Sequence, residues 1–262
     1  MTVRHRTRRT HSWARRQIGS VRKAGFHLRY GSAAFVVSYF AARFRVRLAD
    51  GVGKGIAANT YDHRQLSRLI AWARRERPTL FLDIGANLGL YSCVLVGAGH
   101  VPRAIAFEPD RDNRAALADS IALNGLAERI RIEACALGAA TGEAVLVEGP
   151  RSNRGTSRLV GGVADDAASG VERYRVPVRR LDDVVAIRGA VLLVKIDVEG
   201  HERDVIEGAT RTLSENRCLL QVEAFGTGHV GALEALGYTH LGSIADDHYW
   251  VGGSAGGTHP PP

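Results

Sequence analysis

The sequence predicts an α/β fold in which helices cover both faces of a mostly parallel sheet. Short, continuous apolar runs recur along the chain, and segments with apolar residues at helical spacing separate them. Strands buried on both faces give such continuous runs, and parallel neighbours need a crossover connection that is usually a helix. We therefore expect a Rossmann-like architecture.

The expected elements begin with an alternating apolar and basic pattern at 44–48. This pattern predicts a half-buried strand, and Asp50-Gly51 predicts a hairpin turn after it. Apolar residues at helical spacing after Tyr61 predict a helix that ends before Pro78. Further strands are expected at 79–84, 104–107, 130–136, 144–147, 174–178, 191–196 and 218–223, with helices at 113–124 and 202–214.

The chain divides into three expected parts. Residues 1–43 form a basic arm with a short helix, 44–252 form one domain that starts with the hairpin, and 253–262 form a disordered tail. The alternation of strands and helices breaks at about 140–188, where a Gly-, Ser- and Arg-rich stretch occurs. An insertion at the carboxyl edge of a sheet can help to form a substrate site.

The basic charge is confined to the arm. The net charge is +8, but the first 49 residues hold twelve Arg or Lys and no Asp or Glu, which leaves 23 basic and 27 acidic residues for the remainder. The body is therefore slightly acidic, which disfavours a basic nucleic-acid-binding domain. The arm, with Trp13 as an amphipathic anchor, is expected to contact an anionic surface of lipid or nucleic acid, or simply to be solvated.

The cysteines indicate a reducing compartment. Cys93, Cys135 and Cys218 are odd in number, lack C-x-x-C spacing and lie in apolar runs. Reduced cysteines pack there as small hydrophobic residues. No apolar stretch is long enough for a transmembrane helix. We expect a cytoplasmic protein, with peripheral attachment to a membrane through the arm as an open option.

The turn after the expected strand 79–84 predicts a ligand site. Asp83 ends the strand, and Gly85, Asn87 and Gly89 follow where the chain turns into a helix. Such a turn needs positive φ and a close approach of the ligand to the backbone. The next strand ends at Glu108, whose carboxylate can accept hydrogen bonds from both hydroxyls of a ribose.

The sequence of this turn distinguishes between a dinucleotide and S-adenosylmethionine as the cofactor. A dinucleotide site normally reads G-x-G-x-x-G, but Asn87 stands at the second glycine, and Asp83 would lie badly beside a pyrophosphate. Acidic groups suit a cofactor with a sulfonium and an ammonium group, which favours S-adenosylmethionine. Nicotinamide or flavin binding and a non-catalytic Rossmann-like binding module stay as alternatives.

A second cluster of ionisable residues follows the strand 191–196. The end of this strand and the start of its helix carry Lys195, Asp197, Glu199 and His201. So many ionisable side chains are costly to bury, so we expect a polar ligand to lie beside them. Strand alternation places Lys195 and Asp197 on one face. These four residues are our candidate catalytic groups, with His201, Asp197 or Glu199 as base. In the simpler interpretation, Glu199 favours the helix N-terminus and His201 is solvated.

The motifs, in order and spacing, resemble the FkbM family of methyltransferases. They are FLDIGANLGLYS, AFEPD, VPVRRLDDV, LLVKIDVEGHERDVIEGA and LLQVE, and they cover roughly residues 50–238. The resemblance implies a seven-stranded class I methyltransferase fold and S-adenosylmethionine as methyl donor, with Pro109 and Ala136 as further cofactor contacts. It also implies O-methylation of a hydroxyl on a sugar, glycolipid or secondary metabolite, so that the partner is a small-molecule or glycan acceptor.

A metal ion and an RNA acceptor have less support in the sequence. Asp197, Glu199 and Glu223 offer hard oxygen ligands for a divalent ion, but no histidine or cysteine spacing supports a metal site, so none is predicted. The basic arm would suit RNA, but an N-P-P-Y type tetrapeptide is missing after the strand 191–196. Methylation of RNA therefore stays an alternative.

Overall fold

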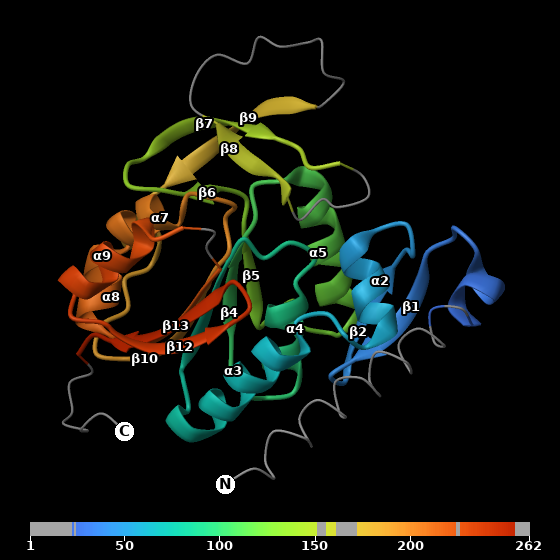
Figure 1. Ribbon diagram of the computed structural model, residues 1–262, viewed down its shortest axis with the longest axis horizontal. Helices are drawn as coiled ribbons and strands as arrows, with labels where there is room; N and C mark the ends of the chain where they lie inside the picture. The colour runs from blue at the N-terminus through green and yellow to red at the C-terminus, as the bar shows by residue number, and fades with distance from the viewer. Residues whose placement is uncertain (1–22, 24, 151–155, 161–171, 224–225, 255–262) are drawn as a thin grey trace, which may run out of the picture.

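A computed structural model describes residues 23, 25–150, 156–160, 172–223 and 226–254. Its main sheet has seven strands in the order β12-β13-β11-β10-β3-β4-β5 (Figure 1). The five strands from β11 to β5 are parallel to one another, whereas β13 runs antiparallel to β11 and to β12. This arrangement confirms the Rossmann-like prediction. The strands are β3 (Leu80–Ile84), β4 (Ala104–Phe107), β5 (Ile130–Glu133), β10 (Val191–Ile196), β11 (Arg217–Glu223), β12 (Thr239–Ile244) and β13 (Asp247–Gly252).

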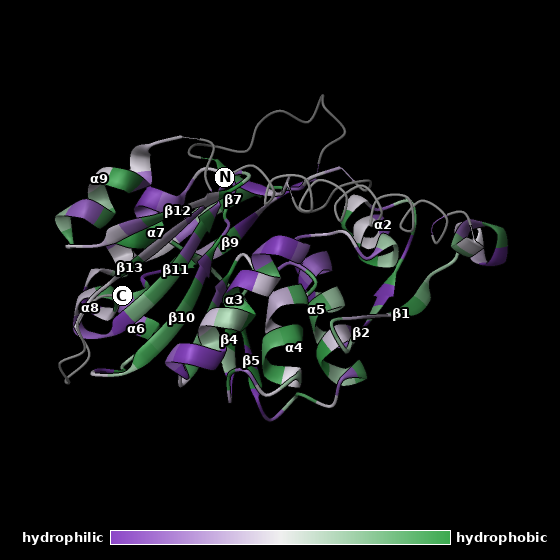
Figure 2. Ribbon diagram, turned by 60° about the horizontal axis from the view of Figure 1, so that its bottom comes forward, coloured by the Kyte–Doolittle hydropathy of each residue, from purple (hydrophilic) through white to green (hydrophobic). Residues whose placement is uncertain are grey.

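Helices cover both faces of this sheet because alternate side chains of each strand point to opposite sides. Phe81, Leu193 and Leu219 pack on the face covered by α3 (His63–Glu76), α4 (Leu90–Gly97) and α5 (Arg111–Leu123). The intervening residues, such as Leu82 and Val194, pack on the other face. That face is covered by α6 (Leu181–Val184), α7 (Glu202–Gly208), α8 (Thr210–Glu215) and α9 (Gly228–Ala235). Figure 2 shows hydrophobic central strands between helices that also carry hydrophilic residues.

The predicted hairpin exists, but its turn lies elsewhere. Strands β1 (Phe35–Tyr39) and β2 (Ala42–Val46) are paired antiparallel. A turn of two residues, Phe40 and Ala41, connects them, and both residues have positive φ. This is the two-residue turn that matches strand twist, but it lacks the usual Asn or Gly. The predicted turn at Asp50-Gly51 is wrong. Asp50 instead caps α2 (Gly51–Ala58), where its carboxylate accepts a hydrogen bond from the Gly53 amide at 2.6 Å.

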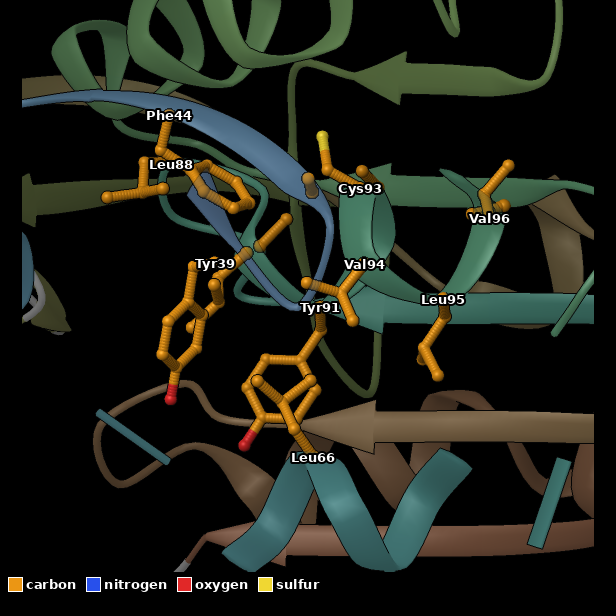
Figure 3. Close-up of a cluster of buried hydrophobic side chains, with 14 of the residues drawn as sticks. Tyr39, Phe44, Leu66, Leu88, Tyr91, Cys93, Val94, Leu95 and Val96 are labelled. Atoms are coloured by element: carbon orange, nitrogen blue, oxygen red, sulfur yellow. The ribbon is translucent and has the colours of Figure 1, made fainter. Parts of the chain in front are cut away.

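The hairpin completes the hydrophobic core on the α4 side of the sheet. Tyr39 and Phe44 belong to the same buried cluster as Tyr91 of α4 and Leu66 of α3, and Figure 3 shows Phe44 next to Leu88 and Tyr39 near Tyr91. All these side chains are buried. The boundary predicted between residues 43 and 44 therefore divides a hairpin that packs as one unit, and the domain begins before β1.

The predicted insertion forms a second sheet of four strands in the order β6-β9-β7-β8. Figure 1 shows it across the top of the main sheet. Its members are β6 (Ala136–Leu137), β7 (Gly142–Val147), β8 (Arg158–Val160) and β9 (Arg173–Arg179). The chain thus returns from β5 to β10 through a layer that lies over the main sheet.

Some boundaries differ from the sequence prediction. The helix expected at 202–214 is broken at Ala209 into α7 and α8, and the strand expected at 130–136 ends at Glu133, with β6 pairing in the other sheet. The arm at 1–22 and the tail at 255–262 lie outside the described residues, as do parts of the insertion. Within the described part of the chain, every helix is too short or too polar to span a bilayer. All three cysteines are buried and unpaired, as predicted.

We predict that Gly208→Ala destabilises the protein by about 1–3 kcal/mol, because overpacking costs energy on this scale. A Cβ at this position in α7 would lie 2.0 Å from the carbonyl oxygen of Gly138, so the helix must shift from the chain after β6. Urea unfolding would measure the change. The control is Gly231→Ala in α9, where a Cβ meets nothing within 4 Å. It should stabilise the helix by about 0.5–1 kcal/mol, and equal effects of both variants would contradict the clash.

Candidate functional site

The carboxyl ends of four parallel strands converge on one cavity. Gly85 follows β3, Glu108 follows β4, Asp197 follows β10, and Glu223 ends β11. The chain goes from β3 to β4 on one side, whereas β10 pairs with β3 on the other side, so the strand order reverses between β3 and β10. In open α/β sheets, ligands bind in the crevice at this switch point.

The cavity has a volume of about 270 Å³ and an uneven lining. The second sheet forms an apolar wall, whereas the strand ends supply carboxylates. The apolar wall includes Cys135, Leu137, Leu146 and Leu159, and the acidic groups are Glu108, Asp197, Glu199 and Glu223. Such a lining can hold a flat apolar ring at one end and cationic or hydroxyl groups at the other.

Glu108 joins the first two strand ends. One carboxylate oxygen accepts a hydrogen bond from the Asn87 amide at 2.7 Å, and the other accepts one from the Asp110 amide at 2.9 Å. The Asn113 side chain is also hydrogen-bonded to the carboxylate, so three of its about four lone-pair positions are occupied. Burial raises the pKa of Glu108 to about 7, although both amide hydrogen bonds oppose this rise. The carboxylate is therefore fixed in position before a ligand binds.

The turn after β3 has the predicted backbone. Gly85, Asn87 and Gly89 all have positive φ. A Cβ on Gly85 would lie 1.7 Å from the carbonyl oxygen of Asp197, so this glycine allows β3 and β10 to approach at their ends. At Gly89, a Cβ would lie 2.4 Å from Leu117, so this glycine instead allows α4 to pack on α5. Gly85 and Asn87 line the cavity with Pro109 and Ala136, whereas Gly89 does not.

A polar row crosses the main sheet beneath the cavity. Asp83, Lys195 and Gln221 are neighbours in register on three adjacent strands and point to the same face. Lys195 is 3% exposed and donates a hydrogen bond to Asp197 at 2.5 Å. Its ammonium also lies 4.9 Å from the ring centre of Tyr91. Burial alone would lower the pKa of Lys195, but the carboxylates of Asp197 and Asp83 outweigh this effect and raise it.

Asp83 lies in this row and not in the main cavity. It accepts hydrogen bonds from the Ser92 hydroxyl at 2.6 Å and the Ser92 amide at 3.1 Å. It borders a small adjoining pocket of about 30 Å³, together with Tyr61, Asp62 and Lys195. Burial raises the pKa of Asp83, and Lys195 and the two hydrogen bonds oppose this shift. The carboxylate thus anchors the start of α4 beside the buried ammonium.

Further carboxylates surround the ammonium of Lys195. Tyr91 donates a hydrogen bond to Asp62 at 3.0 Å, and Gln221 donates one to Asp247 at 2.6 Å. Burial raises the pKa of Asp62 to about 6, with Lys195 opposing the shift. Burial also raises the pKa of Asp247. The site therefore holds more acidic groups than its one buried lysine can neutralise.

Glu223 and Glu199 complete the acidic end of the cavity. Glu223 is half-buried and lines the cavity together with Asp197. Burial, followed by the charge of Asp197, raises the pKa of Glu223 to about 8. The pKa of Glu199 is raised by the same two causes. Asp197 is thus paired with Lys195, and its charge raises the pKa values of both glutamates.

His201 lies outside the cavity lining. Its Nε2 is 3.0 Å from the carbonyl oxygen of Leu159 in β8, and its Nδ1 is 3.3 Å from Asp204. Both partners are acceptors, so the ring acts as a donor in this arrangement. His201 therefore ties the second sheet to the start of α7. This geometry favours a positioning role over the predicted role of base.

The structure brings most of the predicted site residues to one place and adds others. Lys195 supports the cavity from below, and Gly89, Asp83 and His201 stand outside its lining. The residues that sequence reasoning did not assign include Tyr61, Asp62, Asp247 and Gln221. Gln221 carries a signal in the sequence, because it is a polar residue between the apolar Leu220 and Val222 in the middle of the strand. Across the described residues, no cluster of three or more His, Cys, Asp or Glu has the geometry to hold a metal ion.

Comparison with known families finds one match that covers most of the site. The sequence model of the methyltransferase FkbM domain matches residues 83–238, which is more than half of the chain. The match begins at Asp83, near the end of β3, and includes all of β10 and β11. The matched region therefore contains Glu108, Lys195, Asp197 and Glu223.

Individual relatives are more distant. The hexuronic acid methyltransferase AglP of Haloferax volcanii is 26% identical over 231 residues, which cover 86% of this chain and 84% of that protein. A methyltransferase FkbM structure from Methylobacillus flagellatus KT is 21% identical with a TM-score of 0.48, covering 66% of this chain and 43% of that one. The TrmK structure of M. capricolum with S-adenosylhomocysteine is 10% identical with a TM-score of 0.38, covering 73% and 66%. The chain thus spans less than half of the M. flagellatus protein.

We predict that Lys195→Met lowers the free energy of unfolding by about 3 kcal/mol at pH 8, because it leaves buried carboxylates without their cation. The loss should be smaller at pH 5. Without the ammonium, the pKa values of these carboxyls rise further in the folded state, so protonation at lower pH relieves the repulsion. Urea unfolding at both pH values would measure this, with the exposed Lys54→Met as control. An equal loss at pH 5 and pH 8 would contradict the electrostatic role.

Proposed function

We propose, since the chain belongs to the FkbM family of methyltransferases, that it transfers a methyl group from S-adenosylmethionine to a hydroxyl group of a sugar. The observation that carries the proposal is the cavity at the switch point, in which Glu108 and the turn after β3 lie opposite Asp197 and Glu223. A glycolipid or a hydroxylated secondary metabolite would present the same reacting group.

The residues around Glu108 fit the methyl donor. The carboxylate is held by the amides of Asn87 and Asp110 and by the Asn113 side chain, and its remaining lone pair can accept a hydrogen bond from a ribose hydroxyl. The apolar wall beside Pro109 and Ala136 suits an adenine ring. The acidic lining suits an ammonium and a sulfonium group. When bound, the donor supplies an electrophilic methyl group, and the chain supplies alignment and exclusion of water.

The acceptor is proposed from the chemistry of the other half of the cavity. A hydroxyl oxygen needs a group that accepts its proton, and carboxylates line this side. The relative from Haloferax volcanii is named for a hexuronic acid, which supports a sugar acceptor. Leu146 of β7 and Leu159 of β8 lie over the cavity and can shield the reacting atoms from water.

The four candidate catalytic residues at the end of β10 and the start of α7 would then have different roles. Lys195 neutralises and orients Asp197 through their 2.5 Å ion pair. Asp197 and Glu199 face the cavity beside the reacting groups. His201 holds β8 over the cavity through the carbonyl oxygen of Leu159. We propose that His201 affects the reaction through this contact.

We predict that Glu108→Ala weakens binding of S-adenosylhomocysteine by about 1.5–3 kcal/mol, the scale of a lost charge-assisted hydrogen bond in a buried site. Isothermal titration calorimetry would measure the affinity, and Glu128→Ala, on the exposed side of the chain after α5, is the matched control. Unchanged affinity in a folded Glu108→Ala variant would remove Glu108 from the donor site.

Methyl transfer itself requires a product assay. Purified protein would be incubated with S-adenosylmethionine and a panel of methyl glycosides, methyl glycuronides and extracted glycolipids. Mass spectrometry should detect a product heavier by one methylene group, and its loss in Glu108→Ala would link the reaction to this cavity. Failure to bind the donor or its demethylated product would contradict the proposed function.

A further inference from the structure

We propose that Tyr61 binds the acceptor sugar and contributes to its selection, with the phenol ring against one face of the sugar and the hydroxyl bonded to a sugar oxygen. This inference rests on the proposed function, because it concerns the same cavity. Tyr61 lies in the connection between α2 and α3. It precedes the region that matches the FkbM domain, which begins at residue 83. The acceptor contact would thus come from outside the matched region.

The first argument is the place of Tyr61, where the main cavity meets the small adjoining pocket. Tyr61 lines both spaces. Gly85, Asn87 and Asp197 also line both, so Tyr61 is the aromatic residue at this junction among the described residues. Phe107 borders the main cavity as well, but it is 1% exposed, whereas Tyr61 is half-buried. Tyr61 is therefore the aromatic ring that a ligand in the cavity can reach.

The second argument is that the surrounding chain fixes Tyr61 before a ligand binds. Its carbonyl oxygen accepts a hydrogen bond from the hydroxyl of Tyr39 in β1, and its amide donates one to the carbonyl of Gly55 at 3.3 Å. A Cβ on Gly55 would lie 2.9 Å from both Cβ and Cδ2 of Tyr61, so this glycine lets the tyrosine pack on α2. The next residue, Asp62, accepts a hydrogen bond from Tyr91 at 3.0 Å. A ring held in this way loses little freedom on binding.

The third argument is the chemistry around the phenol. Within the part of the chain that the structure describes, the hydroxyl of Tyr61 has no hydrogen-bond partner. Burial, followed by the charge of Asp62, raises the pKa of Tyr61, so the hydroxyl keeps its proton and can donate to a sugar oxygen. Asp197 and Glu223 line the same cavity and can accept from sugar hydroxyls. The C–H face of a sugar is apolar and fits an aromatic ring with a polar edge.

The position of Tyr61 favours the acceptor over the donor. Tyr61 lines the small pocket together with Lys195 and Asp197, which lie at the end of β10. Glu108, which we assign to the donor, follows β4, and β3 lies between β10 and β4 in the sheet. Among the described residues, Glu108 lines the main cavity and not the small pocket. The ring of Tyr61 can therefore contact a sugar whose reacting hydroxyl lies beside Asp197.

The first test measures acceptor binding to the whole protein saturated with S-adenosylhomocysteine. The probe is the methyl glycoside that the product assay identifies, observed by saturation-transfer difference NMR. We expect Tyr61→Phe to weaken glycoside binding by about 2- to 10-fold, the scale of one neutral hydrogen bond. Tyr61→Ala should weaken it by about 10-fold or more, because the apolar contact is lost as well. The matched control is Tyr30→Phe, on a ring that stacks on Phe35 outside the cavity lining.

The second test separates acceptor binding from a structural role. Calorimetry should show an unchanged affinity for S-adenosylhomocysteine in both Tyr61 variants, and the methyl-transfer assay should show a raised KM for the glycoside. The preference for this glycoside over the others in the panel should fall in Tyr61→Ala, because one selective contact is gone.

The outcomes distinguish this inference from the proposed function. Native glycoside affinity in Tyr61→Ala, or an affinity for S-adenosylhomocysteine that falls as much as the affinity for the glycoside, would overturn the acceptor contact alone. A wild-type protein that binds no S-adenosylhomocysteine, or binds it and methylates no glycoside, would contradict the proposed function and the acceptor contact with it.

Discussion

The ion pairing of the buried Lys195 ammonium stabilises the carboxylates that gather at the carboxyl ends of the strands. Asp83 and Gln221 flank it on adjacent strands, and Asp197 and Asp62 approach it from the loops. A group of carboxylates at one sheet edge would repel one another and favour an open edge. The single cation of Lys195 allows these carboxylates to lie together at one crevice. Burial nevertheless raises the pKa values of Asp62 and Glu108 towards neutral pH.

Close packing of the strand ends gives this charge pattern its geometry. Gly85 has no side chain, so the carbonyl of Asp197 can lie where a Cβ would otherwise be. The same turn places the Asn87 amide on Glu108, which also accepts from Asp110 at the start of α5. Three strand ends are thereby connected through short contacts. The side of the cavity formed by Glu108 and the side formed by Asp197 are consequently held close together.

Much of this architecture could be predicted from local patterns. The apolar run at 191–196 predicts β10 at its observed limits, and the turn from Gly85 to Gly89 has the positive φ values that its glycines indicate. The hairpin turn was missed because Phe40 and Ala41 have no sequence signal for positive φ. Their conformation follows from the packing of Tyr39 and Phe44 on either side.

The site was predictable only where its residues lie close together in sequence. Asp197 and Lys195 share one motif, so their pairing could be expected from strand alternation. The contacts of Asp62 with Tyr91 and of Asp247 with Gln221 join segments that are distant in sequence. His201 was one of three candidate bases, beside Asp197 and Glu199, because histidine can take a proton near neutral pH. Only the tertiary structure shows that its ring bonds to the carbonyl of Leu159.

The strand order also has a consequence for how the chain folds. The clamp between Asn87 and Glu108 closes a loop of about twenty residues, whereas Lys195 meets Asp83 only after a loop of more than one hundred residues has closed. Loop closure costs more entropy as the loop lengthens, and non-local pairing is slow. The β3-α4-β4 unit can therefore form early, as a local nucleus. By the same argument, we expect the pairing of Lys195 with Asp83 to form after this unit.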